Sequence, residues 1–144
     1  MTYGNPWQSY RNVATNTAPP GQLVLMLYDG AIRFLNQALA AFESEDPLEF
    51  NQNISNNIIR AQDIINELNL SLNMTVGGDF ASTMRGLYTY FDRRLQDSNM
   101  QKEETGLREV VQRLTVVRDA WAEMLSKEVD ASKEPGRSSL EAHG

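Results

Sequence analysis

Few side chains in this sequence could carry out acid–base or nucleophilic chemistry. The only histidine is His143, beside the C-terminal residue, and there is no cysteine. A Ser-His-Asp triad and the Glu-x-x-His pairs of di-iron bundles both need an imidazole inside the fold. Thiolate nucleophiles and cysteine-ligated metals are excluded by composition alone. The sequence therefore argues against hydrolytic and metal-based catalysis.

The remaining polar clusters have ordinary structural explanations. Carboxylates gather at Glu103-Glu104 and between Glu43 and Asp46, both at the ends of predicted helices, where they favour the helix dipole or solvate a link. Gly77-Gly78 lacks the GxxxxGK[ST] spacing of a phosphate-binding loop and follows no predicted strand. We expect no enzyme activity, no metal and no cofactor. An enzyme that uses carboxylates without histidine is only a remote alternative.

The composition is typical of one small folded domain. The 144 residues are 41% hydrophobic and 22% charged, with a formal net charge of -6. Basic residues occur only in short pairs such as Arg93-Arg94, so nucleic acid is not an expected partner. No apolar run approaches the roughly 18 residues of a membrane span, and the N-terminus does not resemble a signal peptide. We expect a cytoplasmic protein without membrane insertion.

Gly and Pro lie at the edges of long uninterrupted segments. We expect an irregular N-terminal arm at 1–19, a helical domain at 20–129 and a disordered tail at 130–144. Within the domain, helices are predicted over about 20–43, 47–70 and 80–99, with a last one ending near Val129. Asp46 is the predicted N-cap before Pro47, and Met100 to Lys102 is the predicted link before the last helix.

The apolar residues of these segments recur with a helical period. In the second segment, one face carries Phe50, Ile54, Ile58, Ala61, Ile65, Leu68 and Leu72. The third and fourth segments carry similar stripes, and none alternates with a period of two. Long helices with short connections favour antiparallel neighbours. The predicted fold is therefore all-α, an antiparallel up-down-up-down four-helix bundle.

The first predicted helix is apolar over much more than the ~100° stripe that a surface helix needs. Leu25 and Met26 lie outside the arc that could face the core, and Tyr28 and Ile32 lie at its edge. This helix is either the most central one, or part of its surface binds a partner. The N-terminal arm, with Trp7 among its apolar residues, is expected to dock, either permanently or until a partner displaces it.

Several short motifs resemble the flagellar secretion chaperones of the FliS family. The strongest is Leu27-Tyr28-Asp29-Gly30-Ala31-Ile32, which follows Thr17-Ala18-Pro19 as in that family. Further on, Ala61 to Leu68, Leu87-Tyr88-Thr89-Tyr90 and Arg118-Asp119-Ala120-Trp121 are similar to its second, third and fourth helices. The similarity spans about residues 3–125 in order and spacing. Trp7 departs from the family pattern.

The resemblance implies an export chaperone in the cytoplasm. Its partner would be the disordered C-terminal segment of flagellin, held as short helices until delivery to the flagellar type III export gate. The resemblance, together with the apolar positions that the core does not need, predicts a partner surface. Its residues are Tyr10, Val13, Leu25, Met26, Tyr28, Ile32, Ile59 and Tyr90. One alternative is a self-associating structural bundle whose surplus apolar surface is a homodimer interface. Another is an adaptor with another client. A free chaperone could also cover its groove by forming a homodimer.

Overall fold

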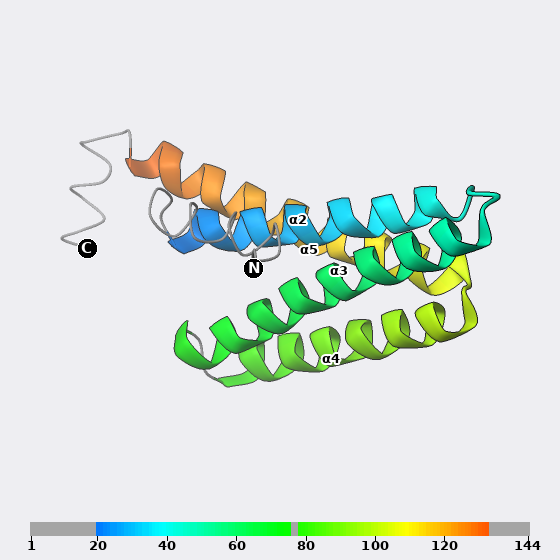
Figure 1. Ribbon diagram of the computed structural model, residues 1–144. Helices are drawn as coiled ribbons and strands as arrows, with labels where there is room; N and C mark the ends of the chain where they lie inside the picture. Colours follow the sequence, from blue (N-terminus) through cyan, green and yellow to red (C-terminus); the bar gives the residue numbers. More distant parts are fainter. Residues whose placement is uncertain (1–19, 76–77, 133–144) are drawn as a thin grey trace, which may run out of the picture.

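The computed structural model describes residues 20–75 and 78–132, which form four α-helices (Figure 1). These are α2 (Pro20–Ala41), α3 (Pro47–Thr75), α4 (Gly78–Gln101) and α5 (Glu104–Ser132). No strand occurs in these two ranges. The prediction of an all-α fold with four helices is confirmed. Most of the expected arm and tail lie outside the described residues.

The helix boundaries follow local chemistry. The Oδ1 atom of Asp46 accepts hydrogen bonds from the backbone N–H groups of Leu48 and Glu49, at 2.9 and 3.2 Å, so Asp46 is an N-cap as predicted. Helix α3 continues to Thr75, past the predicted end near residue 70, because no Gly or Pro interrupts 48–75. Helix α5 likewise extends three residues beyond the predicted end, to Ser132.

The link between α4 and α5 is shorter than predicted. Helix α4 continues through Gln101, and the chain turns at Lys102, whose φ of 54° is left-handed. The N–H of Glu103 donates to the carbonyl of Ser98 at 3.0 Å, the closing bond of a Schellman motif. The Nζ atom of Lys102 also donates to the carbonyl of Asn99 at 2.7 Å. These bonds satisfy helix-end carbonyls without a glycine, so the sequence carried no clear stop signal.

Consecutive helices run in opposite directions (Figure 1). Three hydrogen bonds that join α3 to α4 link Ser55 to Asn99, Gln62 to Asp92 and Asn69 to Arg85. Residue numbers rise along one helix as they fall along the other, which is the pattern of antiparallel neighbours. Helix α5 returns along α2, where Arg118 forms an ion pair with Asp29 at 2.7 Å.

The core runs along the centre of the four helices. Its largest fully buried side chains are Leu35, Ile54, Ile58, Ile64, Ile65, Leu68, Phe91, Leu95, Leu107, Val110 and Leu114. Gly30 allows α2 to approach α3 closely, because a Cβ atom there would lie 3.3 Å from Cδ1 of Ile64. This geometry agrees with the close helix contact that a mid-helix glycine predicts.

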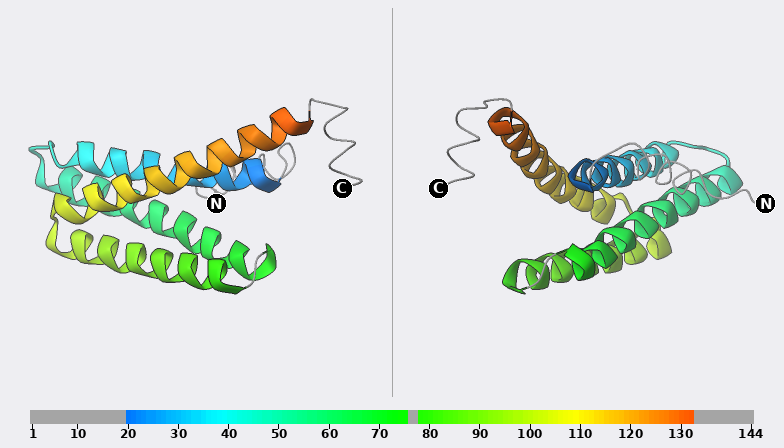
Figure 2. Two further views of the ribbon diagram at one scale, coloured as in Figure 1. Left: turned by 180° about the vertical axis from the view of Figure 1, so that it is seen from behind. Right: turned by 90° about the vertical axis from the view of Figure 1, so that its left-hand side faces the viewer.

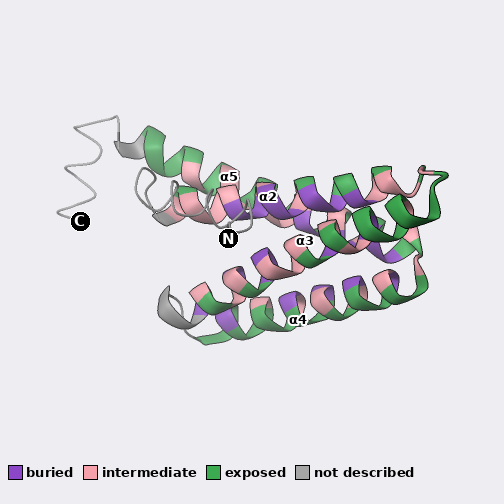
Figure 3. Cartoon of the chain, in the orientation of Figure 1, coloured by how far each residue is buried: buried purple, intermediate pink, exposed green. Residues whose placement is uncertain are grey.

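The bundle opens at one end. Helices α2 and α5 diverge from α3 and α4 toward the start of α2 and the start of α4 (Figures 1 and 2). The last turns of α5 extend past the other helices, and their residues are mostly exposed (Figure 3). Apolar stripes that meet in the middle of the bundle therefore separate at this end, where the candidate site lies.

Candidate functional site

An apolar groove of about 380 Å³ lies at the open end, mainly between α4 and α5. Its described lining is Tyr28, Phe80, Met84, Val116, Val117, Ala120, Trp121 and Met124. Phe80 and Val116 are 53% and 67% exposed, which is high for large apolar side chains in a groove wall. Contiguous exposed apolar surface of this kind is typical of an interaction site.

A narrower cleft of about 50 Å³ shares four residues with this groove: Tyr28, Phe80, Met84 and Trp121. Its remaining described lining is Val24, Leu68, Ser71, Leu72 and Tyr88, from α2, α3 and α4. The groove therefore borders a recess that leads toward the core. An apolar side chain entering this recess would be largely removed from water.

The polar atoms in the groove wall are already paired. The hydroxyl groups of Tyr28 and Tyr88 share a hydrogen bond of 2.6 Å, and burial raises the pKa of both phenols. The indole Nε1 of Trp121 donates to the carbonyl of Gly21 at 2.8 Å, which ties α5 to the first turn of α2. Because these groups have partners, the wall offers a ligand mainly apolar contact.

A second groove of about 370 Å³ continues along α4 and α5, and it is lined by Leu87, Gln112, Arg113, Val116 and Val117. Val116 and Val117 line both grooves. The two form one surface, here named the α4–α5 groove. It runs from Met124 to Arg113, about 16 Å along α5 at ~1.5 Å per residue.

The far end of the α4–α5 groove adjoins a charged cluster. Glu109 accepts hydrogen bonds from the Tyr90 hydroxyl at 2.6 Å and from Nε of Arg94 at 2.8 Å. Nε of Arg113 lies 3.0 Å from the same carboxylate, and its guanidinium lies 5.9 Å from the centre of the Tyr90 ring. The bonds from Tyr90 and then Arg94 lower the pKa of Glu109, so it is ionised at neutral pH.

The predicted partner surface is only partly brought together. Tyr28 is 3% exposed and lies at the floor of the groove, where one of its sides meets the core. Leu25, Met26 and Ile32 are half-buried along α2, and Ile32 packs against the core. Ile59 is exposed on α3 and lines none of the grooves described above, whereas Tyr90 is exposed beside the charged cluster. Tyr10 and Val13 lie outside the described residues.

Sequence reasoning placed several of the groove residues in the core. Phe80, Met84, Val117 and Trp121 belong to the apolar stripes of the third and fourth helices, as a bundle requires. They become groove walls because the helices diverge around them. The signal that could have identified the groove was Val116, an apolar residue opposite the core face of its helix.

The described residues form neither a metal site nor a membrane span. No group of three or more His, Cys, Asp and Glu side chains is arranged among them to hold a metal ion. None of the four helices combines the length and the apolar character needed to span a bilayer.

Comparison with known proteins identifies the class. The family model described as flagellar protein FliS matches residues 3–128. The flagellar secretion chaperone FliS of Bacillus subtilis is 38% identical over 128 residues, 89% of this chain and 92% of the relative. The chaperone of the same name from Salmonella typhimurium is 32% identical over 115 residues, 79% of this chain and 82% of the relative. This chain belongs to the FliS family of flagellar secretion chaperones.

Proposed function

We propose that this protein is a cytoplasmic export chaperone that binds the C-terminal segment of flagellin in the α4–α5 groove. Family membership supports the general role. The observation that carries the proposal is the groove itself, a continuous apolar surface bounded by exposed Phe80, Val116 and Met124. Apolar side chains gathered in a groove, with a few polar groups at one end, are typical of a binding site.

The dimensions suit a short amphipathic helix. A groove of about 16 Å accommodates about three turns, and a helix places an apolar side chain toward it at each turn. The recess beside Tyr28 and Met84 offers a position for the tip of an apolar side chain. Ordering a disordered segment costs conformational entropy, so we expect flagellin to use further contacts outside this groove.

A chaperone of this kind can hold and release its client without an energy source of its own. Flagellin that is still in the cytoplasm must not polymerise, and covering the apolar stripe of its terminal segment prevents that stripe from pairing with another flagellin. Binding holds the segment until the type III export apparatus receives it. Release then depends on competition at the export gate, because neither a phosphate-binding loop motif nor a catalytic constellation was found in the sequence.

Calorimetric titration with flagellin from the same organism tests this function. The comparison uses intact flagellin and flagellin lacking its last ~40 residues, a length that spans a few ordinary helices. We expect one-to-one binding to the intact chain and none to the truncated chain. Equal binding to both would contradict the assignment to the C-terminal segment. Absence of binding to either would contradict the chaperone function.

A second copy of the chain is the alternative occupant, since exposed apolar residues could also pair with each other. In that case light scattering on the free protein would give a mass that rises with concentration. Addition of flagellin would dissociate such a dimer if both compete for the groove. Self-association without any flagellin binding would favour the structural bundle over the chaperone.

A further inference from the structure

We propose that the Arg113 end of the α4–α5 groove is a carboxylate-binding subsite, which pairs with an acidic side chain of the bound helical segment. This inference rests on the proposed function and specifies the chemistry of the segment. Among the described lining of the α4–α5 groove, Arg113 is the only charged residue. The groove is thus apolar along most of its length and basic at one end.

Arg113 is the cation of this cluster that lines the groove. Arg94 and Arg113 both contact the carboxylate of Glu109, and Asp97 is a second acidic neighbour of Arg94, so the carboxylates of the cluster gather on the Arg94 side. Arg108, one residue before Glu109, is already paired with Glu104 at 2.6 Å. The chain as a whole carries a net charge of -6, so the basic character of this end is local.

Arg113 is held in place yet remains accessible. Its contact with Glu109 is made through Nε, while the side chain stays 57% exposed. The Tyr90 hydroxyl and Arg94 fix Glu109 from the α4 side, so Glu109 is a positioning residue for Arg113. A guanidinium has five N–H donors, and one ion pair leaves capacity for a second carboxylate. Such preorganisation reduces the entropy lost on binding.

A single charged end gives the bound helix a direction and a register. Apolar contacts alone tolerate a helix lying either way along a groove, whereas a charge at one end favours one orientation. The bound segment should therefore carry an Asp or Glu about three turns from the apolar residue that lies near Met124. A reversed helix would leave Arg113 without its partner.

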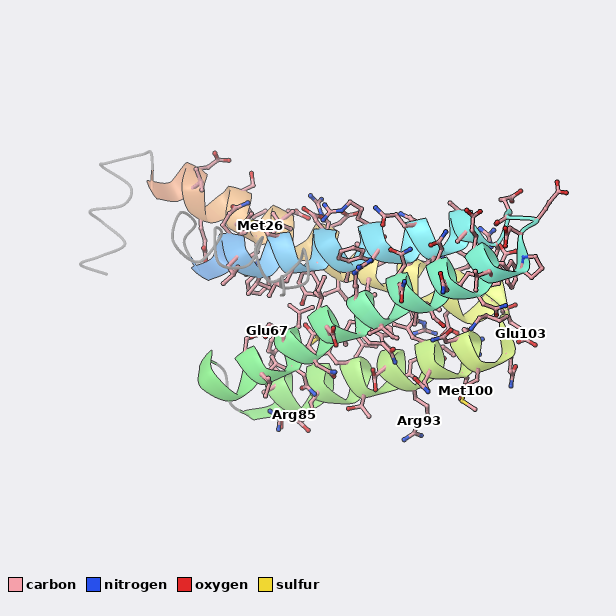
Figure 4. The ribbon with its side chains drawn as sticks, viewed as in Figure 1. Met26, Glu67, Arg85, Arg93, Met100 and Glu103 are labelled. Carbon is pink, nitrogen blue, oxygen red and sulfur yellow. The ribbon has the colours of Figure 1, made fainter. Side chains whose placement is uncertain are left out.

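Charge reversal at Arg113, compared with the same change at Arg93, tests the subsite. Arg93 is exposed on α4 and points away from the bundle (Figure 4), so Arg93→Glu changes the net charge equally without altering the groove. Binding of intact flagellin is measured by calorimetry in low and high salt, after thermal melting shows that both variants fold. We expect Arg113→Glu to weaken binding about tenfold at low salt and Arg93→Glu less than twofold, with the difference shrinking at high salt.

A charge swap adds a second readout. Replacing the acidic residues in the last ~40 positions of flagellin by Lys, one at a time, should identify one variant that restores binding to Arg113→Glu. Equal affinities of Arg113→Glu and Arg93→Glu, without any such rescue, would overturn the subsite while leaving the chaperone function intact. Failure of the unmodified protein to bind flagellin would instead overturn both.

Discussion

The hydroxyl groups of Tyr28 and Tyr88 lie 2.6 Å apart inside the bundle, although 60 residues separate them along the chain. Each side chain is 3% exposed, and each lines the recess beside the α4–α5 groove. The pair connects α2 to α4. It satisfies two polar groups that would otherwise be costly to bury, and it fixes one wall of the candidate site.

Removing both hydroxyl groups should destabilise the protein by less than the two single removals added together. Tyr88→Phe leaves the Tyr28 hydroxyl buried without its partner, and we expect a loss of about 1–3 kcal/mol in the free energy of unfolding. The Tyr28→Phe, Tyr88→Phe double variant should lose less than the sum of the two single variants. Urea denaturation measures all three. Strict additivity would show that the hydrogen bond is not formed in solution.

The same pair predicts a loss of stability at alkaline pH. Burial raises the pKa of both phenols in the folded protein, whereas unfolded tyrosine ionises near pH ~10. The unfolded state therefore releases protons first, and stability falls as the pH rises above about 10. The expected slope is about 1.4 kcal/mol per pH unit for each tyrosine. The double phenylalanine variant should show a clearly shallower slope in urea denaturation between pH 9 and about 11.

Substitutions at two glycines, one in close contact and one open, test how tightly α4 packs against α5. A Cβ atom at Gly106 would collide with Oγ of Ser98 and lie 3.2 Å from the carbonyl of Arg94, so Gly106→Ala should destabilise by about 1–3 kcal/mol. At Gly86, a Cβ atom meets nothing within 4 Å. Gly86→Ala should stabilise α4 by up to ~1 kcal/mol. Thermal melting compares them, and equal effects would contradict the close contact at Gly106.

Much of the fold was predictable because it depends on local signals. The cap at Asp46 and the helical period of α3 are properties of a few neighbouring residues, and both predictions are confirmed. The end of α4 was predicted two residues too early, at Asn99 instead of Gln101, because Lys102 adopts a left-handed φ that usually indicates glycine. Its stabilising bonds come from Ser98 and Asn99 on the preceding helix, and composition alone does not reveal them.

The candidate site was less predictable because it depends on how the helices diverge. Periodicity identifies which face of α5 is apolar, but it cannot tell whether Trp121 meets another helix or solvent at that height. The surplus apolar residues of α2 drew attention to Tyr28, which does line the groove. Ile59 is likewise an apolar residue that the core does not need, yet it lies outside the groove. Surplus apolar character alone therefore does not locate a binding surface.

The central claim, that the α4–α5 groove holds the C-terminal segment of flagellin, is tested most directly by a matched pair of substitutions. Val116→Asp places a carboxylate in the groove, and Leu48→Asp places one at a position of similar exposure, 65% against 67%, that lines no groove described here. Both variants should melt like the unmodified protein, because neither side chain is buried.

Calorimetric titration of the two variants with intact flagellin gives the decisive comparison. We expect Val116→Asp to weaken binding at least tenfold, because a charge must be desolvated against the apolar stripe of the bound helix. Leu48→Asp should bind like the unmodified protein. If Val116→Asp binds flagellin as tightly as Leu48→Asp does, the segment is held elsewhere on the bundle, and the assignment of the α4–α5 groove is wrong.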